Sequence, residues 1–420
     1  MTENSPFNRR GFLKAGAAAT LMTTGNYAFA AGSDKVRVGL IGCGGRGTGA
    51  AGNCATADKG VEIVAMGDLF KDHLEESRNS LKNDLKEQYK VTDDKCFVGF
   101  DAYKSVLSTD VDMVILATPP GFRPYHFQAA VEAKKHIFME KPVAVDGAGV
   151  RRVIATGELA KANKLAVVSG TQRRHQAPYL EIIKRIHEGA IGDIVSAQCY
   201  WNQGSLWLKD RKPEWSATEY QIRNWLYYAW LSGDHIVEQH IHNLDVINWA
   251  FDGNPTKAVA LGGRQVRTQA QYGHVFDHFA VEYQYGNGAR VASYCRQIDG
   301  TASNVSERIV GTLGVSDPGA NIKDHKGKSL YRWEGNYTDP YVQEHIDLIA
   351  SIRSGNLLNE AKRVAESTMT AIMGRMAAYT GKEVTWDKAI NSAESLMPSN
   401  LGFGDLAVPA VAVPGQTPLR

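Results

Sequence analysis

A glycine-rich stretch directly behind an apolar run limits the fold of this chain more than any other feature. Residues 36–41, Val-Arg-Val-Gly-Leu-Ile, are typical of a buried parallel strand, and Gly42-x-Gly44-x-x-Gly47 follows at once. These glycines allow a tight turn, a close approach of the backbone to a pyrophosphate, and close packing of the next helix. The N-terminus of that helix would face the phosphates. The pattern predicts a dinucleotide-binding α/β domain.

An acidic residue at the expected distance strengthens this interpretation. A second apolar run, residues 61–66, ends at Gly67-Asp68, and Asp68 lies 21 residues beyond Gly47, close to the spacing of about 20 in such domains. A carboxylate there accepts hydrogen bonds from the ribose 2′-hydroxyl and repels a 2′-phosphate, so Asp68 favours NAD over NADP. The alternative is a glycine-rich turn in some other α/β protein.

The first thirty residues have the layout of an export signal. Arg9-Arg10 precede an uncharged stretch at 15–22, and Ala28-Phe29-Ala30 supplies a cleavage site. The form is similar to twin-arginine signals, whose pathway carries folded proteins; a disordered basic terminus is the alternative. Residues 1–30 therefore predict a periplasmic or otherwise exported protein. Its NAD would be loaded before export, held tightly and re-oxidised in place.

Length, charge and cysteine content set further bounds. The 420 residues suffice for two domains, and a formal net charge of +2 offers no basic face for nucleic acid. Beyond the signal, no segment approaches the roughly 20 apolar residues of a membrane helix. The five cysteines include no Cys-x-x-Cys pair, so they predict neither a disulfide framework nor a zinc site, and we expect buried thiols.

Further strands are expected at 111–118, 136–139 and 165–170, with helices between them. The sequence contains a series of four motifs: Gly-Cys-Gly-Gly-Arg-Gly, Gly-Asp-Leu-Phe, Ala-Thr-Pro-Pro followed by His126, and Met-Glu-Lys-Pro at 139–142. With these four motifs, the chain resembles the Gfo/Idh/MocA family of glucose–fructose oxidoreductases and inositol dehydrogenases. Most members oxidise or reduce a carbohydrate hydroxyl. The resemblance implies an α/β fold: an N-terminal Rossmann domain plus an α+β domain with an open, mostly antiparallel sheet.

The resemblance also places Lys141 between the nicotinamide and the substrate. Independently, Lys141 follows a predicted parallel strand, and ligands bind at that end of open α/β sheets. An unremarkable surface lysine is the alternative. The predicted dinucleotide contacts come from the glycine loop and from the ends of the strands: Gly42, Cys43, Gly44, Gly45, Arg46, Gly47, Asp68, Thr118, Pro119, His126, Glu140 and Lys141.

Three segments follow the signal. We expect the NAD-binding domain at 34–172, a substrate domain at 173–395, and an extended arm at 396–420 that wraps its own domain or a neighbouring subunit of a homo-oligomer. A hairpin is indicated at 279–294 by period-two strands around a glycine-rich turn. By family analogy, helices near 340–354 and 362–380 pack between the domains or back onto the first.

Residues 233–245 match the family segment that supplies an acidic residue and, four positions later, a histidine. On one continuous helix, Glu238, His242 and Asp245 share a face and His240 lies on the other side. Removing hydride from an alcohol requires a base for the hydroxyl proton. We assign His242 as that base, with Lys141 polarising the same oxygen. Glu238 would bind another hydroxyl or orient the histidine.

Two alternatives to this assignment stay open. The polar residues of 233–245 could simply cap the helix and bridge the domains. They could also bind a metal ion, but His240 faces the wrong way to share one, so we expect no metal.

Aromatic residues suggest where a sugar would bind. Six of the eight tryptophans fall between Trp201 and Trp249, and aromatic faces stack on the apolar faces of sugar rings. Packing in the core or at a subunit interface is the alternative. In the family, an arginine near 171–175 contacts cofactor or substrate, which either Arg173 or Arg174 matches. The predicted substrate contacts are Arg174, Trp207, Trp225, Tyr228, His240 and Asp245.

The function predicted from these features is that of an exported NAD-dependent oxidoreductase. It would act on a ring hydroxyl of a sugar, glycoside or polyol, with a tightly bound, recycled cofactor. A smaller branch of the family suggests an alternative, a glycosidase that oxidises C3 transiently and eliminates the glycosidic bond. The third possibility is a non-catalytic sugar-binding protein with a structural dinucleotide.

Overall fold

The computed structural model describes residues 35–420, so the predicted export signal lies outside the described residues. The first sheet has six parallel strands in the order β3-β2-β1-β4-β5-β6. The strands are β1 Val36–Ile41, β2 Val61–Asp68, β3 Cys96–Val98, β4 Met113–Leu116, β5 His136–Met139 and β6 Val167–Ser169. The order reverses between β1 and β4, and ligands bind at such a switch point, beyond the carboxyl ends of the strands.

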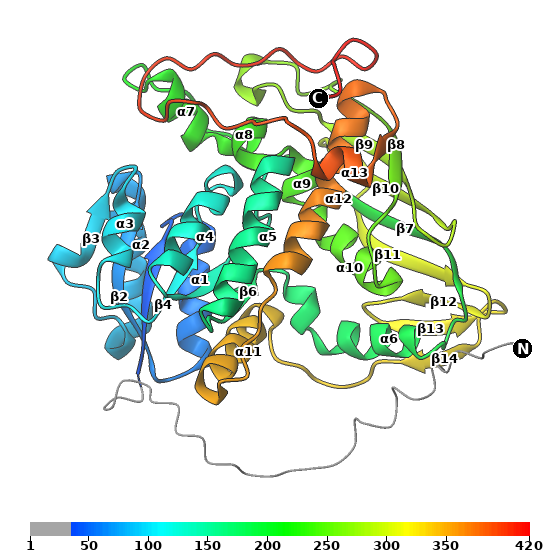
Figure 1. The fold of residues 1–420 in the computed structure, drawn as a ribbon, viewed down its shortest axis with the longest axis horizontal. Helices are drawn as coiled ribbons and strands as arrows, with labels where there is room; N and C mark the ends of the chain where they lie inside the picture. Colours follow the sequence, from blue (N-terminus) through cyan, green and yellow to red (C-terminus); the bar gives the residue numbers. More distant parts are fainter. Residues whose placement is uncertain (1–34) are drawn as a thin grey trace, which may run out of the picture. The chain divides into compact units, whose positions relative to one another are not determined.

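Helices cover both faces of this sheet (Figure 1). They are α1 Gly45–Ala57, α2 Lys71–Leu85, α3 Ala102–Leu107, α4 Arg123–Glu132 and α5 Gly147–Ala162. Successive side chains of β1 point to opposite faces, and Leu40 and Ile41 are both buried but in different apolar clusters. This two-sided burial is why the strands are continuous apolar runs in the sequence.

The second sheet has nine strands in the order β14-β13-β12-β11-β7-β10-β9-β8-β15. The strands are β7 Ile194–Gln203, β8 Lys257–Gly263, β9 His278–Gln284, β10 Arg290–Gln297, β11 Asn304–Gly311, β12 Gly314–Asp317, β13 Asn321–Asp324, β14 Ser329–Arg332 and β15 Val384–Thr385. All neighbours pair antiparallel except β7 and β10, which run parallel. The predicted fold class is therefore confirmed.

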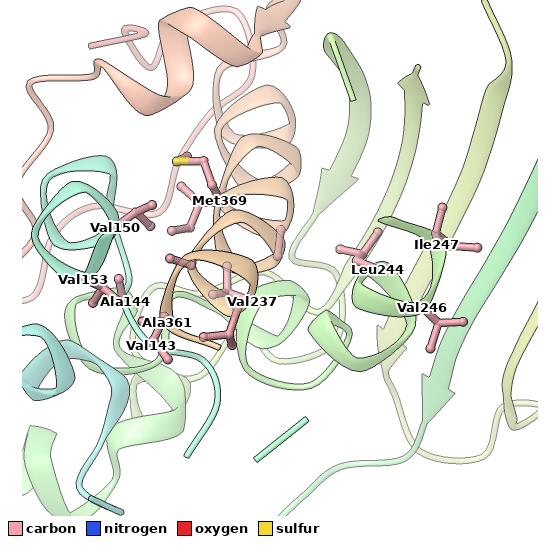
Figure 2. Close-up of a cluster of buried hydrophobic side chains, with 14 of the residues drawn as sticks. Val143, Ala144, Val150, Val153, Val237, Leu244, Val246, Ile247, Ala361 and Met369 are labelled. Atoms are coloured by element: carbon pink, nitrogen blue, oxygen red, sulfur yellow. The ribbon is translucent and has the colours of Figure 1, made fainter. Parts of the chain in front are cut away.

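Late helices of the chain connect the two sheets. The helices that follow β6, in the second half of the protein, are α6 Ala177–His187, α7 Ala217–Arg223, α8 Ala229–Ser232, α9 His235–Glu238, α10 Ile241–Phe251, α11 Pro340–Ser354, α12 Ala361–Thr380 and α13 Trp386–Ile390. Figure 2 shows α12, with Ala361 and Met369, between α5 on one side and α10 on the other. Leu348 and Ile349 of α11 are buried with the core of the first sheet. One of the apolar clusters thus contains residues of both sheets and joins the two halves of the protein.

Several elements carry no clear signal in the sequence. The short strands β3, β12, β13 and β15 and the six-residue α3 were not predicted, because short elements show too few periods of an apolar pattern. Within residues 35–420, no helix is long and apolar enough to span a membrane. All five cysteines are free thiols; four are buried and Cys96 is half-buried.

Candidate active site

The glycine loop between β1 and α1 has the shape that a pyrophosphate requires. Gly42 has φ +98°, and a Cβ atom there would lie 2.6 Å from the backbone of Ala117. A Cβ on Gly47 would lie 1.9 Å from the carbonyl oxygen of Gly42. On Gly44 and Gly45 it would meet nothing within 4 Å, so space is open above the start of α1, which no side chain caps. These residues fit a dinucleotide pyrophosphate at a helix N-terminus.

Asp68 both organises this loop and faces a cavity. Its Oδ2 accepts a hydrogen bond from the Cys43 backbone N–H at 2.6 Å, and its Oδ1 accepts one from the Phe70 N–H at 2.8 Å. The cavity, of about 540 Å³, is also lined by Gly42, Gly44, Thr118, Pro119 and His126. Six of the predicted dinucleotide contacts therefore meet around one cavity at the switch point of the first sheet.

Asp68→Ala is expected to weaken NAD binding and to relax discrimination against NADP. Each lost hydrogen bond to a neutral hydroxyl costs about 0.5–1.5 kcal/mol, and more when the acceptor is charged. Titration of both dinucleotides into the variant measures the two affinities. Asp101→Ala is the matched control, because Asp101 lines the same cavity but is paired with Lys104 at the surface. A preference of the unmodified protein for NADP would show the ribose assignment to be wrong.

His126 is a neutral ring in the wall of this cavity. Burial, and then the nearby charge of Arg123, lowers the pKa of His126 to about 3. Its Nδ1 shares a hydrogen bond of 3.1 Å with Thr118 Oγ1, and its ring stacks on Tyr103 with centroids 4.2 Å apart. His126 therefore offers a flat, uncharged surface and no proton transfer near neutral pH.

Glu140 anchors Arg46 of the glycine loop. The carboxylate accepts a hydrogen bond from Arg46 Nε, and Arg46 Nη2 lies 3.3 Å from Glu344 Oε1. Burial, and then the charge of Glu140, raises the pKa of Glu344 well above its usual range. One guanidinium thus joins the start of α1, the end of β5 and helix α11.

Lys141 and Glu238 meet across the two halves of the protein. Lys141 Nζ donates to the Glu238 backbone oxygen at 2.6 Å and lies 3.1 Å from Glu238 Oε1. The continuous helix predicted for 233–245 is wrong: α9 ends at Glu238 and α10 begins at Ile241. The His242 N–H bonds to the Gln239 oxygen at 3.4 Å. The break therefore leaves the carbonyl of Glu238 available to Lys141.

His242 lies beside this pair on the first turn of α10. Its ring stacks on Trp201 of β7, with centroids 5.5 Å apart. Burial, followed by the charges of Lys141 and Arg173, lowers the pKa of His242 well below its usual 6.5. His242 is therefore unprotonated near neutral pH, which is the state that a general base needs. The structure thus brings together all three predicted catalytic residues.

Three of the predicted substrate contacts are paired with protein groups instead. Asp245 is buried and accepts hydrogen bonds of 2.8 and 3.0 Å from Arg174, so these two side chains satisfy each other. His240 has no exposed surface and shares a hydrogen bond of 2.8 Å with Ser293 Oγ inside the second half. Each of these three side chains therefore has a protein partner where the prediction expected a substrate.

Arg173 is the arginine on the side of His242. Its guanidinium lies 5.8 Å from the centre of the Trp201 ring and pairs with the buried Glu307. Trp201 was counted among the tryptophans but not singled out, since the end of a strand carries no motif. Both residues contribute to the surroundings of His242; Trp201 is a missed functional candidate, and Arg173 is one of the two arginines that the resemblance had left open.

Residues 203–230, the aromatic segment, pack against the first half of the protein. Trp225 lines the dinucleotide cavity, and Trp207 packs edge-on against it with ring centroids 6.0 Å apart. Tyr228 is 2% exposed and packs in one apolar cluster with Phe70 and Phe122. Tyr228 is therefore a core residue, whereas Trp207 and Trp225 as sugar contacts stay a prediction.

Comparisons of the sequence agree with this geometry. Residues 36–170 match the Gfo/Idh/MocA model described as an oxidoreductase family with an NAD-binding Rossmann fold. Residues 179–316 match the GFO/IDH/MocA C-terminal domain model. An inositol 2-dehydrogenase of Acidothermus cellulolyticus is 27% identical over 55% of this chain, but the match spans only 58% of that relative. One of Serratia proteamaculans is 23% identical over 77% of this chain and 87% of its own.

Solved structures share the fold. Scyllo-inositol dehydrogenase from Lactobacillus casei, with bound NAD(H) and scyllo-inositol, matches with a TM-score of 0.64 at 20% identity. The match covers 84% of this chain and 99% of that one.

Proposed function

We propose that this chain, which belongs to the Gfo/Idh/MocA oxidoreductase family, is an NAD-dependent dehydrogenase that oxidises a ring hydroxyl of a cyclic polyol or sugar. The observation that carries the proposal is the meeting of Lys141, Glu238 and His242 beyond the end of β5. The inositol dehydrogenases among its relatives support a cyclic polyol as the substrate class.

Each of the three residues has a distinct role in this reaction. NAD, when bound, accepts the hydride. The ammonium group of Lys141 donates a hydrogen bond to the reacting hydroxyl oxygen and stabilises its developing negative charge. His242, neutral in the free protein, takes the hydroxyl proton. Glu238 positions Lys141 and accepts a hydrogen bond from a second hydroxyl of the ring.

We also propose that the protein is exported with its cofactor in place. The support is the sequence of residues 1–30, with its paired arginines and Ala-x-Ala site. A compartment without a pool of free NAD requires that the cofactor stay bound and be re-oxidised on the protein.

A homo-oligomer is part of the proposal. The second sheet exposes Val259, Leu261 and Tyr294 on the face away from the helices, and Leu261 is 78% exposed. Tyr200 and Tyr294 stack there with centroids 5.5 Å apart. An exposed apolar face of this kind is typical of a protein interface, and a second copy of the sheet would cover it.

One preparation tests this proposal. The full chain, expressed with its signal and recovered from the periplasmic fraction, is expected to contain NAD. Incubation with a panel of inositols, sugars and glycosides, without added dinucleotide, should reduce that NAD and yield a product 2 mass units lighter.

Each other outcome has a definite meaning. Cleavage of a glycosidic bond without net oxidation would make the protein a glycosidase and overturn the dehydrogenase proposal. Binding of sugars without either reaction would make it a sugar-binding protein. Empty protein that exchanges NAD freely would contradict cofactor retention, and recovery only from the cytoplasm would contradict export.

A further inference from the structure

We propose that the C-terminal segment, residues 396–420, forms with the aromatic segment, residues 203–230, a cap that binds the adenine end of the dinucleotide and retains it. The cap consists of five side chains from these two segments: Ile222, Trp225, Met397, Pro398 and Leu401. The inference rests on the NAD binding of the proposed function and adds the residues that hold the adenine.

The position of the cavity identifies the nucleotide group beneath the cap. The glycine loop and Asp68 line one part of the cavity, and all five cap residues line the same cavity. The pyrophosphate binds at the glycine loop and the ribose hydroxyls at the acidic residue after β2. The base attached to that ribose must therefore lie beyond Asp68, on the side of the cap.

The C-terminal segment is fastened on both sides of the cavity. Before it, the Leu396 N–H donates to Asp146 Oδ2 at 2.8 Å. After it, the Gly404 oxygen accepts hydrogen bonds of 3.1 Å from the N–H and the hydroxyl of Thr218. Figure 1 shows this segment, in red, running past α7. It is thus a strap with two fixed ends across the cavity.

Aromatic contacts hold the strap to the first half of the protein. The ring of Phe403 lies 6.2 Å from Phe70 and 5.1 Å from Phe100, measured between centroids, and both of these residues line the cavity. Arg223 of α7 lies 3.8 Å above the Phe70 ring and pairs with Asp72 at 2.9 Å. Both parts of the cap are therefore attached to the loop that follows Asp68.

The chemistry of the cap suits an adenine ring. Apart from Ser399, the side chains that these two segments give to the cavity are apolar or aromatic, and such walls bury a flat, weakly polar base. Leu401 is 40% exposed although it lines the cavity, so a ligand there would remove apolar surface from water. Release of the dinucleotide then requires displacement of the strap.

The test measures dissociation of NADH from the full-length protein by its fluorescence, after a chase with excess NAD. Leu401→Ser removes apolar contact with the base, and Phe403→Ala loosens the strap without changing a side chain that lines the cavity. Both are expected to speed release on the order of tenfold. Val408→Ser is the matched control, because Val408 is an exposed apolar residue, 48% accessible, of the same segment beyond the cap.

Fragments of the cofactor locate the effect. Leu401→Ser should weaken AMP binding and leave nicotinamide mononucleotide binding unchanged. Unchanged NADH release in both variants, equal acceleration in Val408→Ser, or equal weakening of the two fragments would each overturn the cap. Equal melting temperatures of the nucleotide-free proteins exclude unfolding as the cause. The readout does not involve a polyol, so failure to oxidise one would overturn the proposed function and leave the cap standing.

Discussion

Replacing His242 with asparagine is expected to lower turnover by about 10²–10⁴-fold, the usual contribution of a positioned acid or base. Asparagine keeps a polar side chain of similar reach but cannot accept the hydroxyl proton. Folding and NAD binding should be unchanged, since the substitution keeps a polar side chain and leaves the glycine loop and Asp68 as they are. Single-turnover reduction of the bound NAD and the melting temperature are measured on the same sample.

The pH profile of the unmodified protein gives a second check on His242. Burial and the charges of Lys141 and Arg173 lower its pKa well below 6.5. Since a general base must be unprotonated, kcat/KM should stay level from neutral pH downward and fall only well below pH 6.5. Reduction of bound NAD at the normal rate in His242→Asn would place the base elsewhere. A loss of activity in proportion to folded protein would make the role of His242 structural.

Lys141→Met is expected to lower turnover by about 10²–10⁴-fold as well, because the reacting oxygen loses its positively charged hydrogen-bond donor. The variant also leaves the Glu238 carboxylate, whose side chain is 9% exposed, without its cation. Breaking a buried ion pair by removing one partner destabilises by about 3–5 kcal/mol. A fall in melting temperature is therefore expected too and must be separated from catalysis.

A second substitution separates the two effects of Lys141→Met. Adding Glu238→Gln removes the unpaired charge, so the melting temperature should recover while the rate of NAD reduction stays low. Recovery of the rate together with stability would show that Lys141 acts only through Glu238. Loss of the Lys141 charge should also raise the pKa of His242, which moves the acid limb of the profile to higher pH.

Combining His242→Asn with Lys141→Met tests whether they act on one proton. If the two residues work as a unit, the turnover of the double variant falls by much less than the product of the two single fold-losses. Full multiplicativity would mean that Lys141 and His242 act in separate steps.

The sequence by itself determined the framework of the dinucleotide site. The turn at Gly42, the close contact at Gly47 and the carboxylate at Asp68 are local requirements, each met by one residue type at one spacing. The sequence also placed Lys141 just beyond the carboxyl end of a parallel strand, which is the edge where ligands bind, and the structure has β5 end at Met139. Continuous apolar runs in the sequence likewise predicted most strands of the first sheet.

Only the tertiary structure decided the surroundings of the reacting groups. The break between α9 and α10 frees the Glu238 carbonyl for Lys141, which is 97 positions away in the chain. His242 stacks on Trp201, and His240 packs against Ser293 inside the second half. A helical period read from 233–245 cannot reveal such a break, because partners distant in sequence stabilise it.

Packing between segments far apart in sequence also explains where the aromatic segment and the two arginines lie. Trp225 lies on the dinucleotide cavity because α7 packs on Phe70 and the strap of residues 396–406 runs past α7. Arg174 pairs with Asp245, and Arg173 lies near Trp201. Neighbouring residues of equal charge differ only in the partners that the folded chain brings to them, and those partners are set by packing between segments far apart in sequence.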